Sequence, residues 1–231
     1  MRFLINSKKF NSVADILFRP FLIISLTFTF IGLIFAFFLS PDDYQQGSSV
    51  RIMYIHVPSA WLSLMTYLIM TIYSIIALAF RMPFGFIVNT AVAPIGAVFT
   101  ILCIISGSLW GKPMWGTWWV WDARLTSVAV LLLVCLIIIF INYSFENIKV
   151  REKVSAIFVL VGSINLPIVK FSVDWWNTLH QPASISKLSK PSIDPAMMTP
   201  LIIMTVAFIF IGITIAILRI KTEIIAREQN V

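Results

Sequence analysis

Two histidines are the residues of this 231-residue chain whose chemistry best suits metal binding. His56 and His180 are its only histidines, and each stands two residues before a proline, Pro58 and Pro182. Proline biases the residue before it toward extended backbone, which predicts that each histidine lies on a stiff segment at a helix mouth. Neutral imidazole binds iron well, so the pair could occupy both axial positions of a haem iron. A plain surface role for each histidine is the alternative.

Tryptophan is concentrated between the two histidines. Five of the eight tryptophans lie within twelve residues, namely Trp110, Trp115, Trp118, Trp119 and Trp121. A flat apolar ring such as a porphyrin is bound largely by aromatic contact and apolar burial, which such a segment can provide. Membrane interfaces also attract tryptophan, and the spacing of Trp115, Trp118 and Trp119 fits one face of a short helix lying on lipid. Lipid anchoring explains two or three of these indoles better than five.

Three charged residues flank these segments. Asp122 precedes an apolar run and is predicted to cap a helix N-terminus, where its carboxylate accepts from free backbone donors. A polar contact to a ligand is the alternative for Asp122. Arg51 and Arg124 are candidates for binding haem propionates, because arginine forms bidentate contacts with carboxylates. Contact with phospholipid headgroups is the alternative for both arginines.

Composition places the chain in a membrane. Hydrophobic residues make up 59% and charged residues 12%, about half the charged fraction of soluble domains. The net charge of +7 flanks apolar runs and forms no stripe, which argues against a nucleic-acid partner. No phosphate-binding glycine loop, nucleophile and base pair, or paired carboxylates are evident, so we expect no enzyme. Cys103 and Cys135 lie in apolar runs without a Cys-x-x-Cys motif and are interpreted as packing residues.

The apolar runs predict an all-α membrane protein with six transmembrane helices, which form one domain over residues 1–231. Each run is continuously apolar over about 20 residues, which indicates helices rather than barrel strands. Pro94 predicts a kink in the third helix. The fifth is the weakest, because Asn165, Pro167 and Lys170 interrupt it. The predicted spans are residues 21–40, 58–80, 83–109, 125–145, 154–173 and 195–218.

The charges predict an orientation. An even number of spans puts both termini on one side, and that side holds eleven of the 17 lysines and arginines. The richer side is predicted to be cytoplasmic. The outer segments are then residues 41–57, 110–124 and 171–194, so the tryptophan-rich loop joins helices 3 and 4. Both histidines and all eight tryptophans fall at or near this outer side, which predicts a site there.

The segment Trp115-Gly-Thr-Trp118-Trp119-Val-Trp121-Asp122, with His56 and His180 in the flanking outer loops, resembles the signature of the cytochrome c maturation protein C family. The likeness also covers length, number of spans and orientation. It implies a bacterial inner-membrane protein that holds b-type haem transiently at its periplasmic face. The axial ligands would be His56 and His180, and the tryptophan-rich loop would be the platform for the ring.

The same resemblance implies partners. They are an ATP-binding-cassette (ABC) transporter of maturation proteins A and B, a small membrane protein named maturation protein D, and the haem chaperone, maturation protein E, to which haem is presented. Two alternatives stay open: a haem permease or channel subunit, and a cytochrome c haem lyase. A permease should have polar residues through its spans, whereas here they gather outside. The related lyases carry extra histidines within their spans, which this chain lacks.

Overall fold

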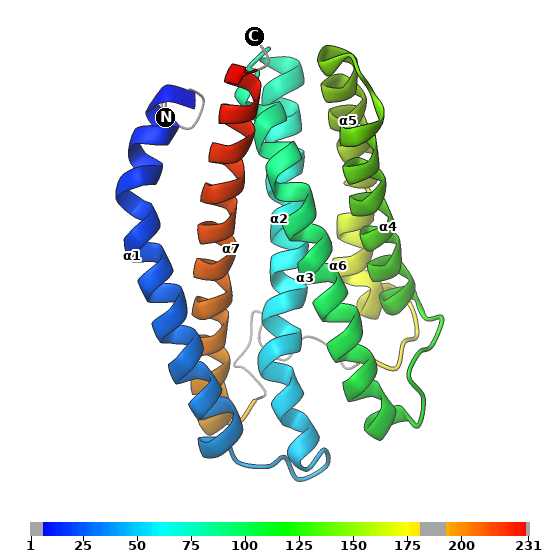
Figure 1. Ribbon diagram of the computed structural model, residues 1–231. Helices are drawn as coiled ribbons and strands as arrows, with labels where there is room; N and C mark the ends of the chain where they lie inside the picture. The colour runs from blue at the N-terminus through cyan, green and yellow to red at the C-terminus, as the bar shows by residue number, and fades with distance from the viewer. Residues whose placement is uncertain (1–6, 181–192, 230–231) are drawn as a thin grey trace.

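The computed structural model describes residues 7–180 and 193–229, and these form a bundle of long helices that run side by side (Figure 1). A π-helical turn, Phe35–Leu39, ends the first helix, and a 3-10 turn, Ser48–Ile52, leads into the second. The helices are α1 (Ser7–Ile34), α2 (Met53–Ala79), α3 (Phe84–Trp115), α4 (Ala123–Ser144), α5 (Ile148–Gly162), α6 (Asn165–Trp175) and α7 (Pro195–Gln229).

The prediction of six transmembrane helices is confirmed, since six helical segments of the described chain are long and apolar enough to cross a membrane. Several extend beyond their apolar runs: α3 continues from residue 109 to Trp115, and α7 continues from residue 218 to Gln229. Hydropathy marks only the part of a helix that suits lipid. The helix itself continues until a capping residue or a break in the backbone ends it.

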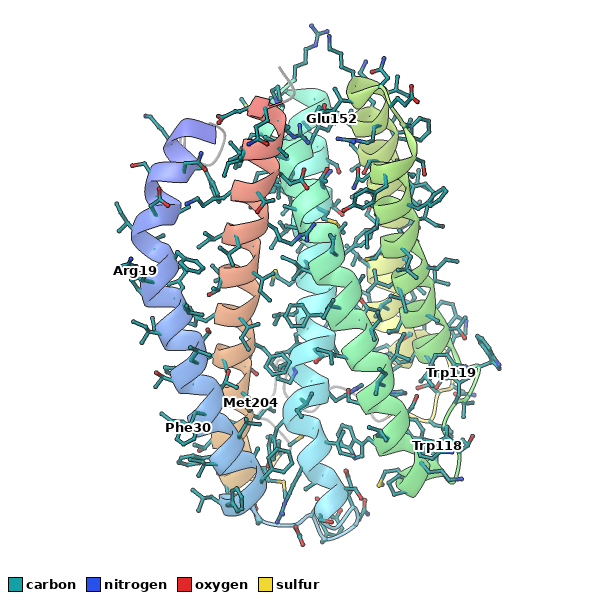
Figure 2. All side chains as sticks on the ribbon, in the orientation of Figure 1. Arg19, Phe30, Trp118, Trp119, Glu152 and Met204 are labelled. Atoms are coloured by element: carbon teal, nitrogen blue, oxygen red, sulfur yellow. The ribbon has the colours of Figure 1, made fainter. Side chains whose placement is uncertain are left out.

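The beginning of α1 and the end of α7 lie at the same end of the bundle (Figure 1). Trp118 and Trp119 lie at the opposite end, away from Glu152, as the side chains in Figure 2 show. The segment between α1 and α2 also lies at the tryptophan end. The structure therefore gathers the predicted outer segments 41–57 and 110–124 at one end of the molecule.

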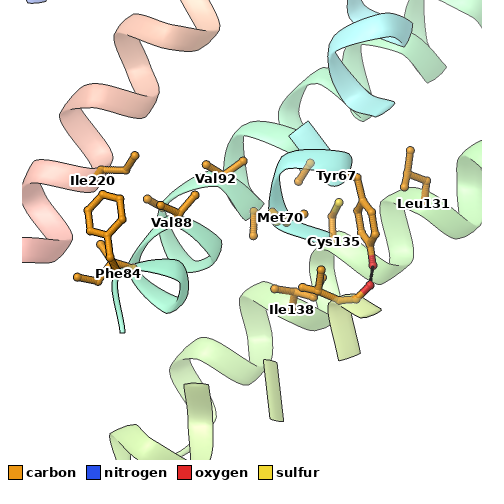
Figure 3. Close-up of a cluster of buried hydrophobic side chains, with 14 of the residues drawn as sticks. Tyr67, Met70, Phe84, Val88, Val92, Leu131, Cys135, Ile138 and Ile220 are labelled. Atoms are coloured by element: carbon orange, nitrogen blue, oxygen red, sulfur yellow. Dashed lines mark hydrogen bonds between the residues drawn. The ribbon is translucent and has the colours of Figure 1, made fainter. Parts of the chain in front are cut away.

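The helix α3 is the most buried span, with α2 and α4 packed against it, while α1 packs on α7. One buried cluster joins α2, α3, α4 and α7 and includes Tyr67, Val88, Leu131 and Cys135 (Figure 3). Its Tyr67 hydroxyl donates to the carbonyl of Val159 on α5 at 3.0 Å. Cys103 and Cys135 are buried free thiols, which agrees with their interpretation as packing residues.

The predicted weakness of the fifth span takes the form of a break. The helix α5 ends at Gly162 and α6 begins at Asn165, so two short helices together make the span Ile148–Trp175. Pro167 is the third residue of α6, where its missing N–H removes no intrahelical bond. The Asn165 amide donates to the carbonyl of Ser127 at 2.8 Å and holds the start of α6 against α4.

Candidate functional site

A pocket with a volume of about 820 Å³ lies at the tryptophan end, and both histidines line it. Its walls come from the segment before α2 and from α2, α3, α4, α6 and the start of α7. The volume lies in the upper part of the range typical of small-molecule sites. Its ring-bearing and cationic lining includes His56, Trp61, Trp110, Trp115, Trp119, Arg124 and His180.

His56 lies within a helix, so the predicted extended segment is wrong for this residue. It is the fourth residue of α2, and Pro58 is also helical and fully buried. So close to a helix N-terminus, proline forfeits a single backbone hydrogen bond. Burial of Tyr54 and Pro58 on the same turn offsets that cost and overrides the local bias of the residue before proline.

Contacts with α3 orient the His56 ring. Its Nδ1 lies 3.1 Å from the carbonyl oxygen of Cys103 and 3.2 Å from Ser106 Oγ. A carbonyl oxygen only accepts, so Nδ1 carries the hydrogen and Nε2 keeps its lone pair. A histidine that binds metal usually donates its other ring N–H in this manner. A Cβ on Gly107 would stand 2.9 Å from His56 Cε1, so this glycine lets α3 approach the ring.

His180 follows α6 in a bend, and Pro182 lies outside the described residues. Its Nδ1 is buried without a hydrogen-bond partner, at 3.9 Å from Asp122 Oδ2, which is too long for a hydrogen bond. The Trp115 ring lies 4.9 Å from the His180 ring, centroid to centroid. Burial, and next the Arg124 cation, lower the pKa of His180 to about 4, while Asp122 opposes the shift. His180 is therefore neutral at physiological pH.

Asp122 caps α4, as predicted. Its Oδ1 accepts from the backbone N–H of Leu125 at 2.8 Å, and its own backbone is extended. The second oxygen, Oδ2, accepts from the N–H of Leu179 at 3.3 Å. One carboxylate therefore fixes the start of α4 and also the segment that carries His180.

The short helix considered as the alternative for Trp115, Trp118 and Trp119 does not form. The helix α3 ends at Trp115, because Gly116 adopts a left-handed conformation (φ 75°) and its N–H bonds the carbonyl of Lys112. Trp110 and Trp115 consequently stand on α3 rather than in the loop. The Trp110 indole N–H donates to Gln46 Oε1 at 2.9 Å.

The loop tryptophans divide into two groups. Trp119 lines the pocket, and its indole N–H is buried without a hydrogen-bond partner. Trp118 and Trp121 are 54% and 78% exposed and are not among the lining residues. The five clustered indoles therefore do not form one wall: three face the pocket and two face outward.

The two arginines are also separated. Arg124 lines the pocket beside His180, and its Nε is buried with no hydrogen-bond partner. Arg51 is not among the lining residues, because its guanidinium donates to Asp42 Oδ1 and to the carbonyl of Phe37, each at 3.0 Å. Of the two, only Arg124 is placed where a pocket ligand could reach it.

Comparison with known proteins identifies the family. All of residues 1–231 match a family model described as Heme exporter protein C. The chain belongs to this family. Among the relatives, Heme exporter protein C of Bradyrhizobium diazoefficiens is 48% identical over 190 residues, covering 82% of this chain and 72% of the relative. Heme exporter protein C of Escherichia coli K12 is 44% identical over 214 residues, covering 92% and 86%.

A further relative is a mitochondrial protein of Marchantia polymorpha whose name places it in cytochrome c biosynthesis. It is 41% identical over 209 residues, covering 84% of this chain and 88% of the relative. Membership of the heme exporter protein C family thus agrees with the resemblance drawn from the tryptophan-rich segment.

Sequence reasoning missed some features of the site in this member of the family. Trp61 lines the pocket from α2. In the sequence it stands alone, five residues after His56, and is typical of a tryptophan that anchors a helix at the membrane interface. The bond from Asp122 to Leu179 joins positions 57 residues apart, and no local pattern signals it. Gln46 gave no signal either, because it lies in a turn and its partner Trp110 is 64 residues away on α3.

Proposed function

We propose that this chain binds haem in the pocket, with His56 and His180 as axial ligands to the iron. One observation carries the proposal: the only two histidines of the chain, on segments far apart in sequence, line one pocket together with four tryptophans. Haem is the cargo of this site. The indole and aliphatic lining suits the apolar ring.

The donor set fits haem. His56 offers Nε2 as a free lone pair because Nδ1 is bonded to α3, and His180 is neutral because its pKa is low. Three buried polar atoms without hydrogen-bond partners lie around the pocket: His180 Nδ1, Trp119 Nε1 and Arg124 Nε. Buried polar atoms normally have partners, so their presence favours a polar ligand here. A carboxylate of haem would suit the Arg124 guanidinium.

The wider role is delivery of haem for cytochrome c biogenesis. The family name and the name of the Marchantia relative support this role. We propose that the chain presents haem to a periplasmic haem chaperone, maturation protein E, and works with an ABC transporter of maturation proteins A and B and with the small maturation protein D. The membrane is the bacterial inner membrane, with the pocket on the periplasmic side, because the opposite side holds eleven of the 17 cations.

Delivery is favoured over the two alternatives. Both histidines belong to the pocket, so none remains for a second haem position within the spans, as a lyase would use. The polar lining of the pocket gathers at one end of the bundle, which argues against a permease path through it.

The test is spectroscopic. Protein purified from haem-replete membranes should show the absorption spectrum of low-spin, bis-histidine haem. His56→Ala and His180→Ala should each lose or change that ligation, while Trp176→Ala, half exposed and outside the pocket lining, should keep it. Undiminished bis-histidine haem in the double histidine variant would overturn the ligand assignment. Wild type without haem would overturn the proposed function.

A further inference from the structure

The pocket reaches well below its mouth, toward the middle of the bundle. Its inner lining is mainly apolar and comes from three helices, with Ala60, Trp61, Leu64, Leu125, Val128 and Val169, and it also includes Ser63 and Lys170. Leu64 lies eleven residues after Met53, which is about 16 Å along α2. This part of the pocket therefore lies at a level where the outside of the bundle faces lipid rather than water.

Four helices surround this inner part, and their contacts are unequal. The helices α2 and α3, α3 and α4, and α4 and α6 pack closely, whereas the contact of α6 with α2 is far smaller. Closely packed helices exclude a bulky ring, because protein interiors are dense and hold few voids. Among the four helices around the pocket, the least closely packed neighbours are α2 and α6, and we call the line between them the seam.

The break between α5 and α6 explains this seam. The helix α5 is tied to α2 by the hydrogen bond from Tyr67 to Val159, and no Cβ could stand at Gly162 without clashing with the Tyr67 hydroxyl. The helix α6 is instead tied to α4 by the bond from Asn165 to Ser127. The two halves of one span are thus held by different neighbours. Beyond the break the chain packs on α4 and has little contact with α2.

We infer that haem reaches the pocket sideways from the bilayer, through the seam between α2 and α6, rather than through the mouth. This inference rests on the proposed haem-binding function. A porphyrin is largely apolar and can dissolve in lipid, so a mainly apolar inner wall matches its chemistry. The mouth offers the opposite surface, since the carboxylates of Asp43 and Asp194 line it beside the ion pair of Asp42 with Arg51. Those carboxylates would repel the two carboxylates of haem arriving from water.

The experiment measures the rate of haem uptake by protein reconstituted into liposomes whose lipid already contains haem. Leu64→Trp fills the seam and should slow the appearance of the bis-histidine spectrum by about tenfold, because the larger side chain leaves the porphyrin less room to pass. Leu64→Ala widens the seam and should speed uptake. The final bis-histidine spectrum is recorded for each variant, and the uptake rate is expressed relative to that variant's own end point. The control is Leu68→Trp, one turn further along α2, exposed and outside the pocket lining.

A second arm blocks the mouth. Tyr44 lines the pocket but is 91% exposed, so Tyr44→Cys can carry a bulky maleimide at the rim, and both natural thiols are buried. The labelled variant should take up lipid-borne haem at the wild-type rate. Normal uptake rates in both Leu64 variants, or slow uptake in the labelled variant alone, overturn the route and leave haem binding intact. Wild type that takes up no haem overturns both the route and the proposed function.

Discussion

At the scale of single residues, Asp122 shows how one side chain can link helix formation to the site. Its two oxygens bind the N–H groups of Leu125 and Leu179, so it caps α4 and restrains the His180 segment at once. Asp122→Ala should lower the free energy of unfolding by about 1 kcal/mol through the lost cap, and it should also weaken haem retention. Thermal unfolding and haem content of the purified protein measure the two effects.

Asn147→Ala is the matched control for Asp122. Asn147 caps α5 by accepting from the N–H groups of Lys149 and Val150, at the other end of the bundle. Asn147→Ala should lower the free energy of unfolding by a similar amount without loss of haem. Equal haem loss in the two variants would mean that Asp122 acts only through general stability.

The pKa of His180 predicts how haem affinity changes as the pH falls. A histidine binds iron only when its lone pair is free, and burial together with the Arg124 cation lowers this pKa to about 4. Haem affinity should thus be constant from pH 8 to about 5 and fall by about tenfold per unit below pH 4. Arg124→Ala removes a charge that disfavours the protonated ring, so the pKa rises and acid loss begins at higher pH.

The acid midpoint of haem loss, followed by absorption during titration, checks this argument. Arg51→Ala is the control, because Arg51 is not among the pocket-lining residues and its guanidinium is bonded to Asp42. Its midpoint should equal that of wild type. An unmoved midpoint in Arg124→Ala would remove this arginine from the electrostatics of His180.

At the scale of helices, the spans could be predicted from the sequence and their ends could not. Each span needs about 20 apolar residues, and that pattern is visible in the sequence. The extra turns of α3 depend on Gly116, whose left-handed conformation no hydropathy pattern reveals. Likewise, Asn165 and Pro167 indicated a weak fifth span. The two halves of that span are held by hydrogen bonds with Tyr67 on α2 and Ser127 on α4, which are contacts between helices distant in sequence.

The close approach of α3 to α2 yields a prediction at this scale. Gly107→Ala would place a Cβ against the His56 ring, while alanine favours the helix by about 1 kcal/mol over glycine. We therefore expect altered haem ligation with little loss of stability. Gly212→Ala on α7, where the new Cβ would meet Leu62 at 3.3 Å, should leave the haem spectrum unchanged. A normal haem spectrum in Gly107→Ala would show that the ring has room to move.

At the scale of the whole molecule, the orientation in the membrane decides where haem can be delivered. The pocket lies at one end of the bundle and the start of α1 and the end of α7 lie at the other, so a single measurement of sidedness fixes both. Tyr44 is exposed at the pocket end, and Glu146 is exposed at the end that holds the start of α1 and the end of α7. Both native cysteines are buried, so single introduced cysteines report with little background.

In intact cells, an impermeant thiol reagent should label Tyr44→Cys and should label Glu146→Cys only after the membrane is opened. The physical reason is the excess of lysine and arginine at the Glu146 end, which resists translocation across the membrane. The reverse pattern would put the pocket in the cytoplasm and exclude delivery to a periplasmic chaperone. The proposed haem site at His56 and His180 would survive that result, because its geometry depends on the packing of α2, α3 and α4 and not on the side of the membrane.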